Sequence, residues 1–390
     1  MALTIDATTS KVVEAQSSDP TASTNPVGGA GTVILNTTTG KIFTCTDASN
    51  NANVWTTVGP TPATADEITK QGSDPTISTN PAGGVGSIIL NTTSGKMFVC
   101  TDATTGANEW IAGVDGAVSP SYDVDFLVIG GGGGGAGYHY TGGGGSGGYR
   151  NSFNGEMSGG GNTGGEAALS VTPSTYYLVT IGGGGAGGPN AYSGTQRGVN
   201  GDPSVFGSIT SLGGGGGANY GTAGAAGGSG GGGIGAAGAG FDGGAGESNQ
   251  GFAGGSGTDA TPCGASGGGG GGAGGVGGSP CASKLGGVGL ESSITGSAVP
   301  RGGGGGTGSE TASGAGGSGG GGTQANGAVN TGGGGSGRQG SGVGFIGGSG
   351  VVILRMLTSN YSGTTTGTPT VSTSGSDTIL IYNASGSYTG

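Results

Sequence analysis

Short apolar segments alternate with polar or glycine-rich sequence along the whole chain. In the second half they read "YDVDFLVI" (122–129), "AALSVTPSTYYLVTI" (167–181), "VFGSITSL" (205–212) and "GVVILRML" (350–357). β-branched and aromatic residues dominate these segments, as is typical of strands. No segment has apolar residues at helical spacing, and the Ala-rich stretches contain too much glycine for a helix. The pattern therefore predicts an all-β fold with no significant α-helix.

The amino-terminal third contains two copies of one module. Residues 18–55 align with residues 73–110 without gaps, and 26 of the 38 positions are identical. Each copy has β-rich runs separated by a "TTTG" or "TTSG" turn, followed by an Asp/Asn loop and a Trp. We expect each copy to form a small three-stranded antiparallel meander. About 40 residues are too few to bury a good core alone, so we expect the copies to stack or to trimerise.

Cys45 and Cys100 occupy equivalent positions in the two copies, each shortly after an aromatic residue. One interpretation is an interchain disulfide or a metal site. The other is a small buried side chain packed between Phe and Trp, which the sequence favours because one cysteine per copy lacks the paired spacing of metal sites.

Glycine accounts for 110 of the 390 residues and is concentrated between residues 130 and 350, in nine runs of four or more. This region is either a flexible linker or a structure ordered by its backbone. Three of the apolar segments lead directly into a glycine run, which favours order. Without a Cβ, glycine can adopt the extended left-handed helix of three residues per turn, and such helices can pack closely and exchange backbone hydrogen bonds. We expect a bundle of polyglycine II helices, clamped by the β segments.

The sequence "DFLVIGGGGGGAG" (125–137) also resembles the first strand and phosphate-binding turn of a dinucleotide fold. Such a turn must be followed by an amphipathic helix. The sequence that follows, "YHYTGGGGSGGYRNSFNG", cannot form one, and no Gly-Lys-Ser/Thr loop occurs. Nucleotide binding is therefore not expected.

Charge and residue types exclude several further functions. The net charge is −11 and the ten basic residues are scattered, so we expect no nucleic-acid partner. There is no apolar run long enough for membrane insertion and no signal peptide, which predicts synthesis in a cytoplasm. With a single histidine and isolated carboxylates, we expect no enzyme activity, no metal site and no cofactor.

Four segments in series carry a family resemblance: "VDFLVIGGGGGGAG", "LSVTPSTYYLVTIGGGGAGG", "FGSITSLGGGGGA" and "GGSGVVILRM". In this order they resemble the glycine-rich domain of bacteriophage tail-fibre and receptor-binding proteins, and the amino-terminal modules look like repeats from such fibres. The domain is also similar in composition to the tip adhesins of T-even-like phages. In those adhesins, polyglycine helices form a sandwich and the loops between them bind the host surface.

The resemblance implies a virion tail appendage that is released by host lysis and therefore acts outside the cell. Its carboxy-terminal part would bind a host surface glycan or outer-membrane protein. Its amino terminus would attach to other virion tail proteins, and the subunits would form a homotrimer or a filament. The expected segments are 1–17 for attachment, 18–59 and 73–113 for the repeats, 60–72 and 114–121 for linkers, 122–357 for the glycine-rich domain and 358–390 for a terminal β-hairpin.

The carboxy-terminal sequence "SDTILIYNASGSYTG" predicts a hairpin with its turn at "NASG". In the family such a hairpin is expected before the first glycine strand, whereas here it ends the chain. If it cannot fold back onto Asp125–Ile129, it could complete the sheet of the next subunit by strand donation. This would make the protein a structural glycine-rich subunit of a filament or surface coat, which is the alternative function.

Receptor contacts are expected from large side chains between the glycine runs, since loops on a rigid scaffold often carry binding residues. The other interpretation is that these side chains cover the edge of the bundle. A disulfide between Cys263 and Cys281, in the matching contexts "TPCG" and "SPCA", is favoured over two free thiols. The candidate contact residues are Tyr138, His139, Tyr140, Tyr149, Arg150, Phe153, Tyr192, Arg197, Tyr220, Phe241 and Phe252.

Overall fold

The chain folds into two compact units, Met1–Pro120 and Ser121–Gly390. A computed structural model provides the structure, and all of its regular elements are strands or short 3-10 turns in the described part of the chain, which confirms the all-β prediction. The described residues are 13–390 except 27–29, 31, 37–40, 50, 59–68, 82–83, 95, 114–120, 162–163, 192–195, 237–238, 260–263, 282 and 310–312.

Each amino-terminal repeat forms a four-stranded sheet rather than a three-stranded meander. An additional strand lies parallel to the first strand of the meander and comes from residues expected to be the attachment segment or the linker. The sheet orders are β1-β2-β3-β4 and β5-β6-β7-β8. The strands are β1 (Val13–Gln16), β2 (Val33–Asn36), β3 (Ile42–Asp47), β4 (Val54–Val58), β5 (Thr69–Gln71), β6 (Ile88–Asn91), β7 (Met97–Asp102) and β8 (Glu109–Gly113).

Cys45 and Cys100 are buried, and each lies opposite the Trp of its own repeat in the strand register. Both thiols are free, and burial raises the pKa of Cys100. Phe43 and Phe98 complete the small cores. The environment of each thiol therefore supports packing as the role of these cysteines.

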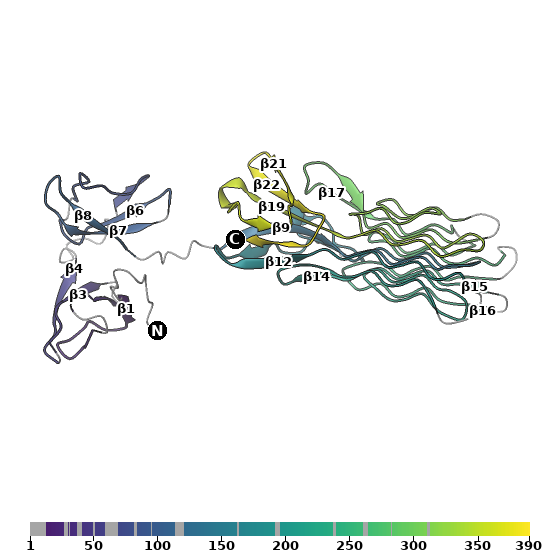
Figure 1. The fold of residues 1–390 in the computed structure, drawn as a ribbon, viewed down its shortest axis with the longest axis horizontal. Helices are drawn as coiled ribbons and strands as arrows, with labels where there is room; N and C mark the ends of the chain where they lie inside the picture. The colour runs from purple at the N-terminus through teal and green to yellow at the C-terminus, as the bar shows by residue number, and fades with distance from the viewer. Residues whose placement is uncertain are drawn as a thin grey trace. The chain divides into compact units, whose positions relative to one another are not determined.

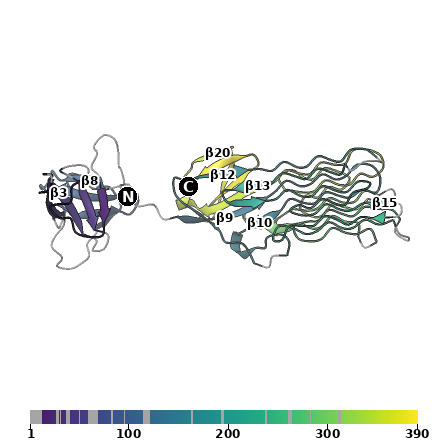
Figure 2. The same cartoon turned by 90° about the horizontal axis from the view of Figure 1, so that it is seen from below.

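The second unit contains two facing sheets at one end (Figure 1, Figure 2). The first has the order β10-β9-β19-β22-β21, with β11 also paired to β9, and the second has the order β14-β13-β12-β23-β20. The strands of the first are β9 (Tyr122–Ile129), β10 (Tyr149–Asn151), β11 (Leu169–Val171), β19 (Val351–Leu357), β21 (Thr370–Ser374) and β22 (Asp377–Tyr382). Those of the second are β12 (Tyr176–Thr180), β13 (Ser204–Phe206), β14 (Ile209–Ser211), β20 (Thr365–Thr366) and β23 (Gly386–Thr389).

Strand β9 is buried on both faces. Phe126 belongs to the core that also contains Phe206 and Tyr388 of the second sheet. Leu127 and Ile129 belong instead to the core on the other side, with Ile294. This explains why "DFLVI" is continuously apolar instead of alternating. The remaining short elements are η1 (Phe153–Gly155), η2 (Thr358–Asn360), β15 (Gly235–Ala236), β16 (Ala239–Gly240), β17 (Leu290–Ser292) and β18 (Val299–Arg301).

The carboxy-terminal segment contains a hairpin at a different place from the predicted one. Strands β21 and β22 pair across a turn at Gly375 and Ser376, whereas the "NASG" turn carries the chain from the first sheet to the second. Strand β22 pairs with β19 of its own chain. The carboxy-terminal strands thus complete both sheets in cis, so the reason for invoking strand donation does not hold in this structure. The segment 169–180 likewise divides between the two sheets, since β11 pairs with β9 and β12 pairs with β23.

The glycine runs extend from these sheets to the opposite end of the unit, where β15 and β16 lie (Figure 1). In the run 130–136, successive N–H groups donate to three neighbouring runs in turn, so that Gly130 and Gly133 both donate to the same neighbour, at Gly148 and Gly145. The carbonyl groups of the same run accept hydrogen bonds from three further runs, which also alternate in a fixed order with a repeat of three residues. A helix of three residues per turn would give this repeat of three, and the polyglycine II conformation stays a prediction. The described neighbours of the run are 142–148, 199–202, 345–348, 182–188, 213–217 and 332–338.

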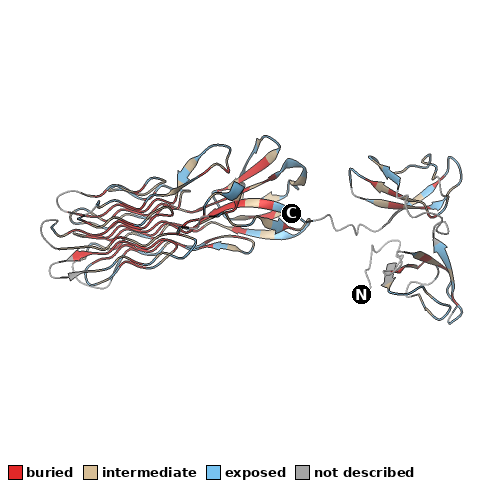
Figure 3. Ribbon diagram, turned by 180° about the vertical axis from the view of Figure 1, so that it is seen from behind, coloured by how far each residue is buried: buried red, intermediate tan, exposed pale blue. Residues whose placement is uncertain are grey.

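Inner and outer runs differ in which positions accept a side chain. Inner runs such as 142–148 are buried throughout, as the continuous red segments of Figure 3 show. In the outer run 182–188, Gly182, Gly185 and Gly188 are buried, whereas Gly183 and Ala186 are exposed. One position in three therefore faces solvent and can carry a side chain.

Candidate functional site

Four turns meet at the end of the glycine bundle away from the sheets, because the runs that precede them are mutually parallel. The runs 182–188, 213–217 and 332–338 all donate to the carbonyl groups of 130–136 in parallel register. We call the described residues of these four turns the tip and define it as residues 137–141, 189–191, 196–198, 219–223 and 338–342.

Hydrogen bonds join these turns to one another. The Tyr138 N–H donates to the Gly342 carbonyl at 2.9 Å. The Gly342 N–H in turn donates to Asn190 Oδ1 at 2.9 Å. The Asn219 side-chain amide donates to the Ala191 carbonyl at 3.2 Å. The tip is therefore one connected surface, although residues 192–195, including the candidate Tyr192, lie outside the described residues.

Tyr138, His139 and Tyr140 are half-buried and packed on one another at the first turn of the tip. The Tyr138 and His139 ring centroids are 4.4 Å apart with the rings edge to face, and the His139 and Tyr140 centroids are 5.9 Å apart. His139 Nε2 lies 3.5 Å from Ser341 Oγ. Tyr138 and Tyr140 have φ angles of 73° and 58°. Bulky residues adopt this left-handed conformation only at a cost of about 1–2 kcal/mol, and such strain is often found at functional sites.

Arg338 was not among the sequence candidates, yet it lies beside this aromatic group. Its backbone N–H donates to the Ala136 carbonyl at 3.0 Å and to Thr141 Oγ1 at 3.1 Å. The guanidinium carbon lies 5.0 Å from the centroid of the Phe345 ring, and its Nε is buried without a hydrogen-bond partner. The sequence did contain a signal that could have identified Arg338 as a candidate, because Arg338 follows a glycine run just as Tyr138 does.

The other predicted contact residues divide between the two ends of the unit. Arg197 and Tyr220 are exposed in the tip, and the Arg197 Nη1 donates to the Ala223 carbonyl at 3.3 Å. Phe241 packs against Ala218 and Ile234. Phe252 is half-buried near Gly161 on the surface of the bundle.

Tyr149 was wrongly expected to be a contact residue. It is fully buried in β10 within the second core, and burial raises its pKa. Phe153 packs at the edge of the same core, beneath the guanidinium of Arg355 at 4.7 Å from the ring centroid. The sequence around them looked like a loop because it is rich in glycine, but apolar side chains from distant segments, such as Ile129 and Ile294, bury it.

These findings agree with a sequence comparison in which the glycine-rich domain profile matches residues 114–357. The chain belongs to the glycine-rich domain family. No curated protein and no solved structure matches it.

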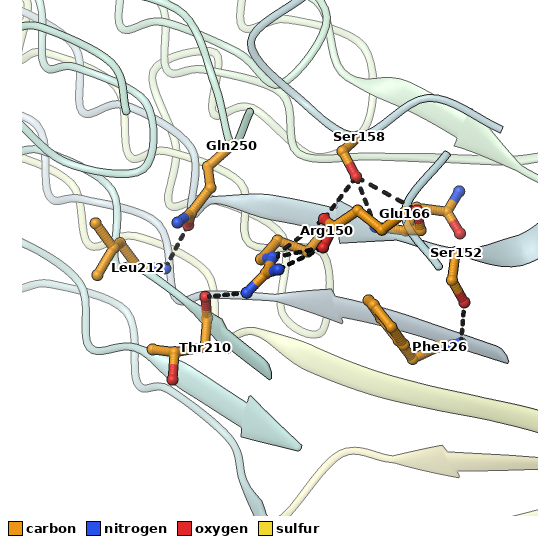
Figure 4. A network of polar contacts seen from close by, with 9 residues as sticks. Phe126, Arg150, Ser152, Ser158, Glu166, Thr210, Leu212 and Gln250 are labelled. Carbon is orange, nitrogen blue, oxygen red and sulfur yellow. Dashed lines mark hydrogen bonds and ion pairs between the residues drawn. The ribbon is translucent and has the colours of Figure 1, made fainter. Parts of the chain in front are cut away.

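Within this glycine-rich domain, a second polar cluster surrounds Arg150 at the sheet end (Figure 4). Arg150 pairs with the Glu166 carboxylate through both Nε and Nη2, and its Nη1 donates to the Thr210 carbonyl at 3.3 Å. Ser158 donates to Glu166 at 2.9 Å, and Gln250 accepts the Leu212 N–H at 2.8 Å. A hollow of about 260 Å³ lies beside the cluster. Because Nε, Nη1 and Nη2 of Arg150 all donate hydrogen bonds within the cluster, its contacts hold β10, β14 and the segment around Glu166 together.

Metal sites and membrane-spanning helices are both absent from the described residues. There, no group of three or more His, Cys, Asp or Glu side chains is placed to hold a metal ion. No helix in the same residues has the length and apolar character needed to cross a bilayer. Cys281 is disulfide-bonded, but Cys263 lies outside the described part of the chain, so their pairing stays a prediction.

Proposed function

We propose that this protein is a viral tail-fibre or adhesin subunit that binds a host cell-surface receptor through the tip. The observation that carries the proposal is the conjunction of a hydrogen-bonded glycine scaffold with a strained aromatic turn at its end. A scaffold ordered by its backbone leaves the turns free to vary in sequence, as a recognition surface requires.

The family resemblance supplies the biological setting of the proposal. The amino-terminal repeats would join the subunits, as a homotrimer or a filament, to other virion tail proteins, and the glycine-rich domain would face the host. The proposal assigns no catalytic residue and no cofactor. The alternative, a structural subunit of a filament or coat without a receptor, rests on the same glycine scaffold but gives no role to the tip.

The test is binding of the fluorescently labelled full chain to a panel of intact bacterial strains, measured by flow cytometry. The tip variant combines Tyr138→Gly, His139→Ala and Tyr140→Gly, because glycine tolerates the φ angles of both tyrosines. Tyr176→Ala is the matched control, since this tyrosine of β12 is 62% exposed.

We expect saturable binding to a subset of strains, lost in the tip variant and retained in the control. Equal binding by the tip variant would contradict the proposal. Absence of binding to every strain would favour the structural alternative.

A further inference from the structure

Strand β21 forms an open edge of the first sheet (Figure 1). It pairs with β22 on one side and has no neighbouring strand among the described residues on the other. Ser374 and Asp377 flank a tight turn, so every second residue from Thr370 to Ser374 hydrogen-bonds with β22. The N–H and carbonyl groups of Val371 and Thr373 therefore point outward, where a further strand would pair with them.

Strand β21 has no charged residue to guard its edge. Natural edge strands often carry a charge that prevents pairing with another chain, and β1, β5, β8 and β10 each contain one. By contrast, no charged residue occurs between Met356 and Asp377. Residues 370–373 are all exposed, and the Val371 side chain is 48% exposed. In a chain with a net charge of −11, this uncharged segment lets two copies approach without strong repulsion.

The edge is complementary to itself. When two β21 strands pair antiparallel about a two-fold axis at Ser372, Val371 of each copy lies opposite Thr373 of the other. Each opposed pair exchanges both of its backbone hydrogen bonds, so every outward-pointing group of the two residues gains a partner. Pro369 has no N–H and ends the pairing beyond Thr370.

We infer that β21 is a self-association edge, through which a second copy of this chain extends the first sheet. Such an edge goes beyond the receptor-binding function, because it needs neither the tip nor the amino-terminal repeats. It also differs from strand donation, since each copy keeps both of its completed sheets. A strand of five residues buries little surface, so the contact should be weak and concentration-dependent.

Disulfide trapping in the full chain tests the register. In the inferred pair, the two copies of Ser372 face each other with Cα atoms about 4.5 Å apart. That distance lies within the range of about 4.4–6.8 Å that a disulfide spans, so Ser372→Cys should give a covalent dimer on mild oxidation. Thr370→Cys alone should give none above the wild-type level, because its two copies would lie about 13 Å apart along the strands. A mixture of Thr370→Cys and Ser374→Cys should cross-link, since these positions oppose each other.

Sedimentation velocity of the full chain, at concentrations up to about 500 µM, measures the contact without trapping. Val371→Lys should weaken association roughly tenfold or more, because it places a charge within the pairing edge. Thr210→Lys adds the same charge to an exposed position of β14, an edge strand of the second sheet, and should leave association unchanged.

Three results would overturn the inference. The first is a Ser372→Cys dimer no more abundant than in the wild type, and the second is equal cross-linking of Ser372→Cys and Thr370→Cys, which indicates random collision. The third is association that Val371→Lys leaves unchanged, which would assign it to another surface. Receptor binding by the tip stands or falls separately, because Val371→Lys should not alter binding to cells.

Discussion

Gly133 and Gly215 approach so closely that a Cβ built on Gly133 would lie 2.2 Å from the Gly215 carbonyl oxygen. Contacts of this kind recur along the run with the same repeat of three as the hydrogen bonds, since Gly130 meets Leu212 of the same neighbour. Packing in this domain is therefore backbone against backbone, and the missing side chain is what makes the packing possible.

This relationship predicts opposite outcomes for two alanine substitutions. Gly133→Ala should unfold the bundle or destabilise it by several kcal/mol, because the neighbouring backbone cannot move away without breaking its own hydrogen bonds. Gly183→Ala is the control, since its Cβ would meet only the Asp202 side chain, at 3.2 Å. It should change the free energy of unfolding by less than about 1 kcal/mol. Thermal melts of the two variants give the comparison, and similar melting temperatures would count against close packing.

Tyr388 links the last strand to the first sheet. It is fully buried, and its hydroxyl lies 2.5 Å from that of Tyr122 on β9. Tyr388→Ala should cost about 3–5 kcal/mol as a core deletion, and Tyr388→Phe about 1 kcal/mol for the lost hydrogen bond. Denaturant titration measures both changes. Little effect of Tyr388→Ala would mean that β23 does not complete its own chain's sheet.

Glu156 makes stability depend on pH in a defined direction. Burial raises the pKa of this carboxyl group, but hydrogen bonds from Ser292, Ser293 and Asn151 outweigh it and hold the pKa below its usual value. The stabilisation is therefore complete above the unfolded pKa of about 4.3 and is lost as pH falls through the lower folded value.

Glu156→Gln should accordingly destabilise the protein by about 1 kcal/mol at neutral pH, and the difference should shrink below about pH 4. Chemical denaturation of both proteins at several pH values measures it. Glu247→Gln, at an exposed carboxylate, provides the control. A difference that grew towards acid pH would contradict the assignment.

The disulfide of Cys281 should stabilise the domain. If Cys263 is its partner, mass spectrometry without reductant should find the two cysteine peptides linked, and reduction should separate them. Cys281→Ser should lower the free energy of unfolding by up to about 3 kcal/mol and abolish any effect of reductant on melting. Recovery of Cys263 as a free thiol would refute the pairing.

Sequence alone was sufficient to predict the apolar strands but not their partners, and it missed the short strands β1, β5 and β10. The apolar segments that contain β9, β12, β13 and β19 were all found, because burial of side chains leaves a local signal. The turn at "NASG" looked like a hairpin, yet it crosses between sheets, since turn chemistry is the same whether the next strand pairs beside the last or faces it.

The buried side chains of the glycine-rich region were missed for a different physical reason. Tyr149 and Arg150 are adjacent, but the first lies in the core and the second pairs with Glu166 at the surface. The side chains packed around Tyr149, such as Ile294 and Ile353, come from segments distant in sequence, which local hydrophobicity patterns do not report. In the outer runs, every third position is exposed and can carry a side chain. Which positions these are becomes clear only when the neighbours of each run are known from its hydrogen bonds.

Hydrogen exchange of the glycine amides tests the central claim, that backbone hydrogen bonds order this domain as a rigid scaffold. The account predicts that amides of the inner run 142–148 exchange as slowly as those of β9 and β19, because all open only on global unfolding. Amides of the exposed tip should exchange faster. Exchange of the inner run at the rate of an unfolded chain, with β9 still protected, would contradict the account.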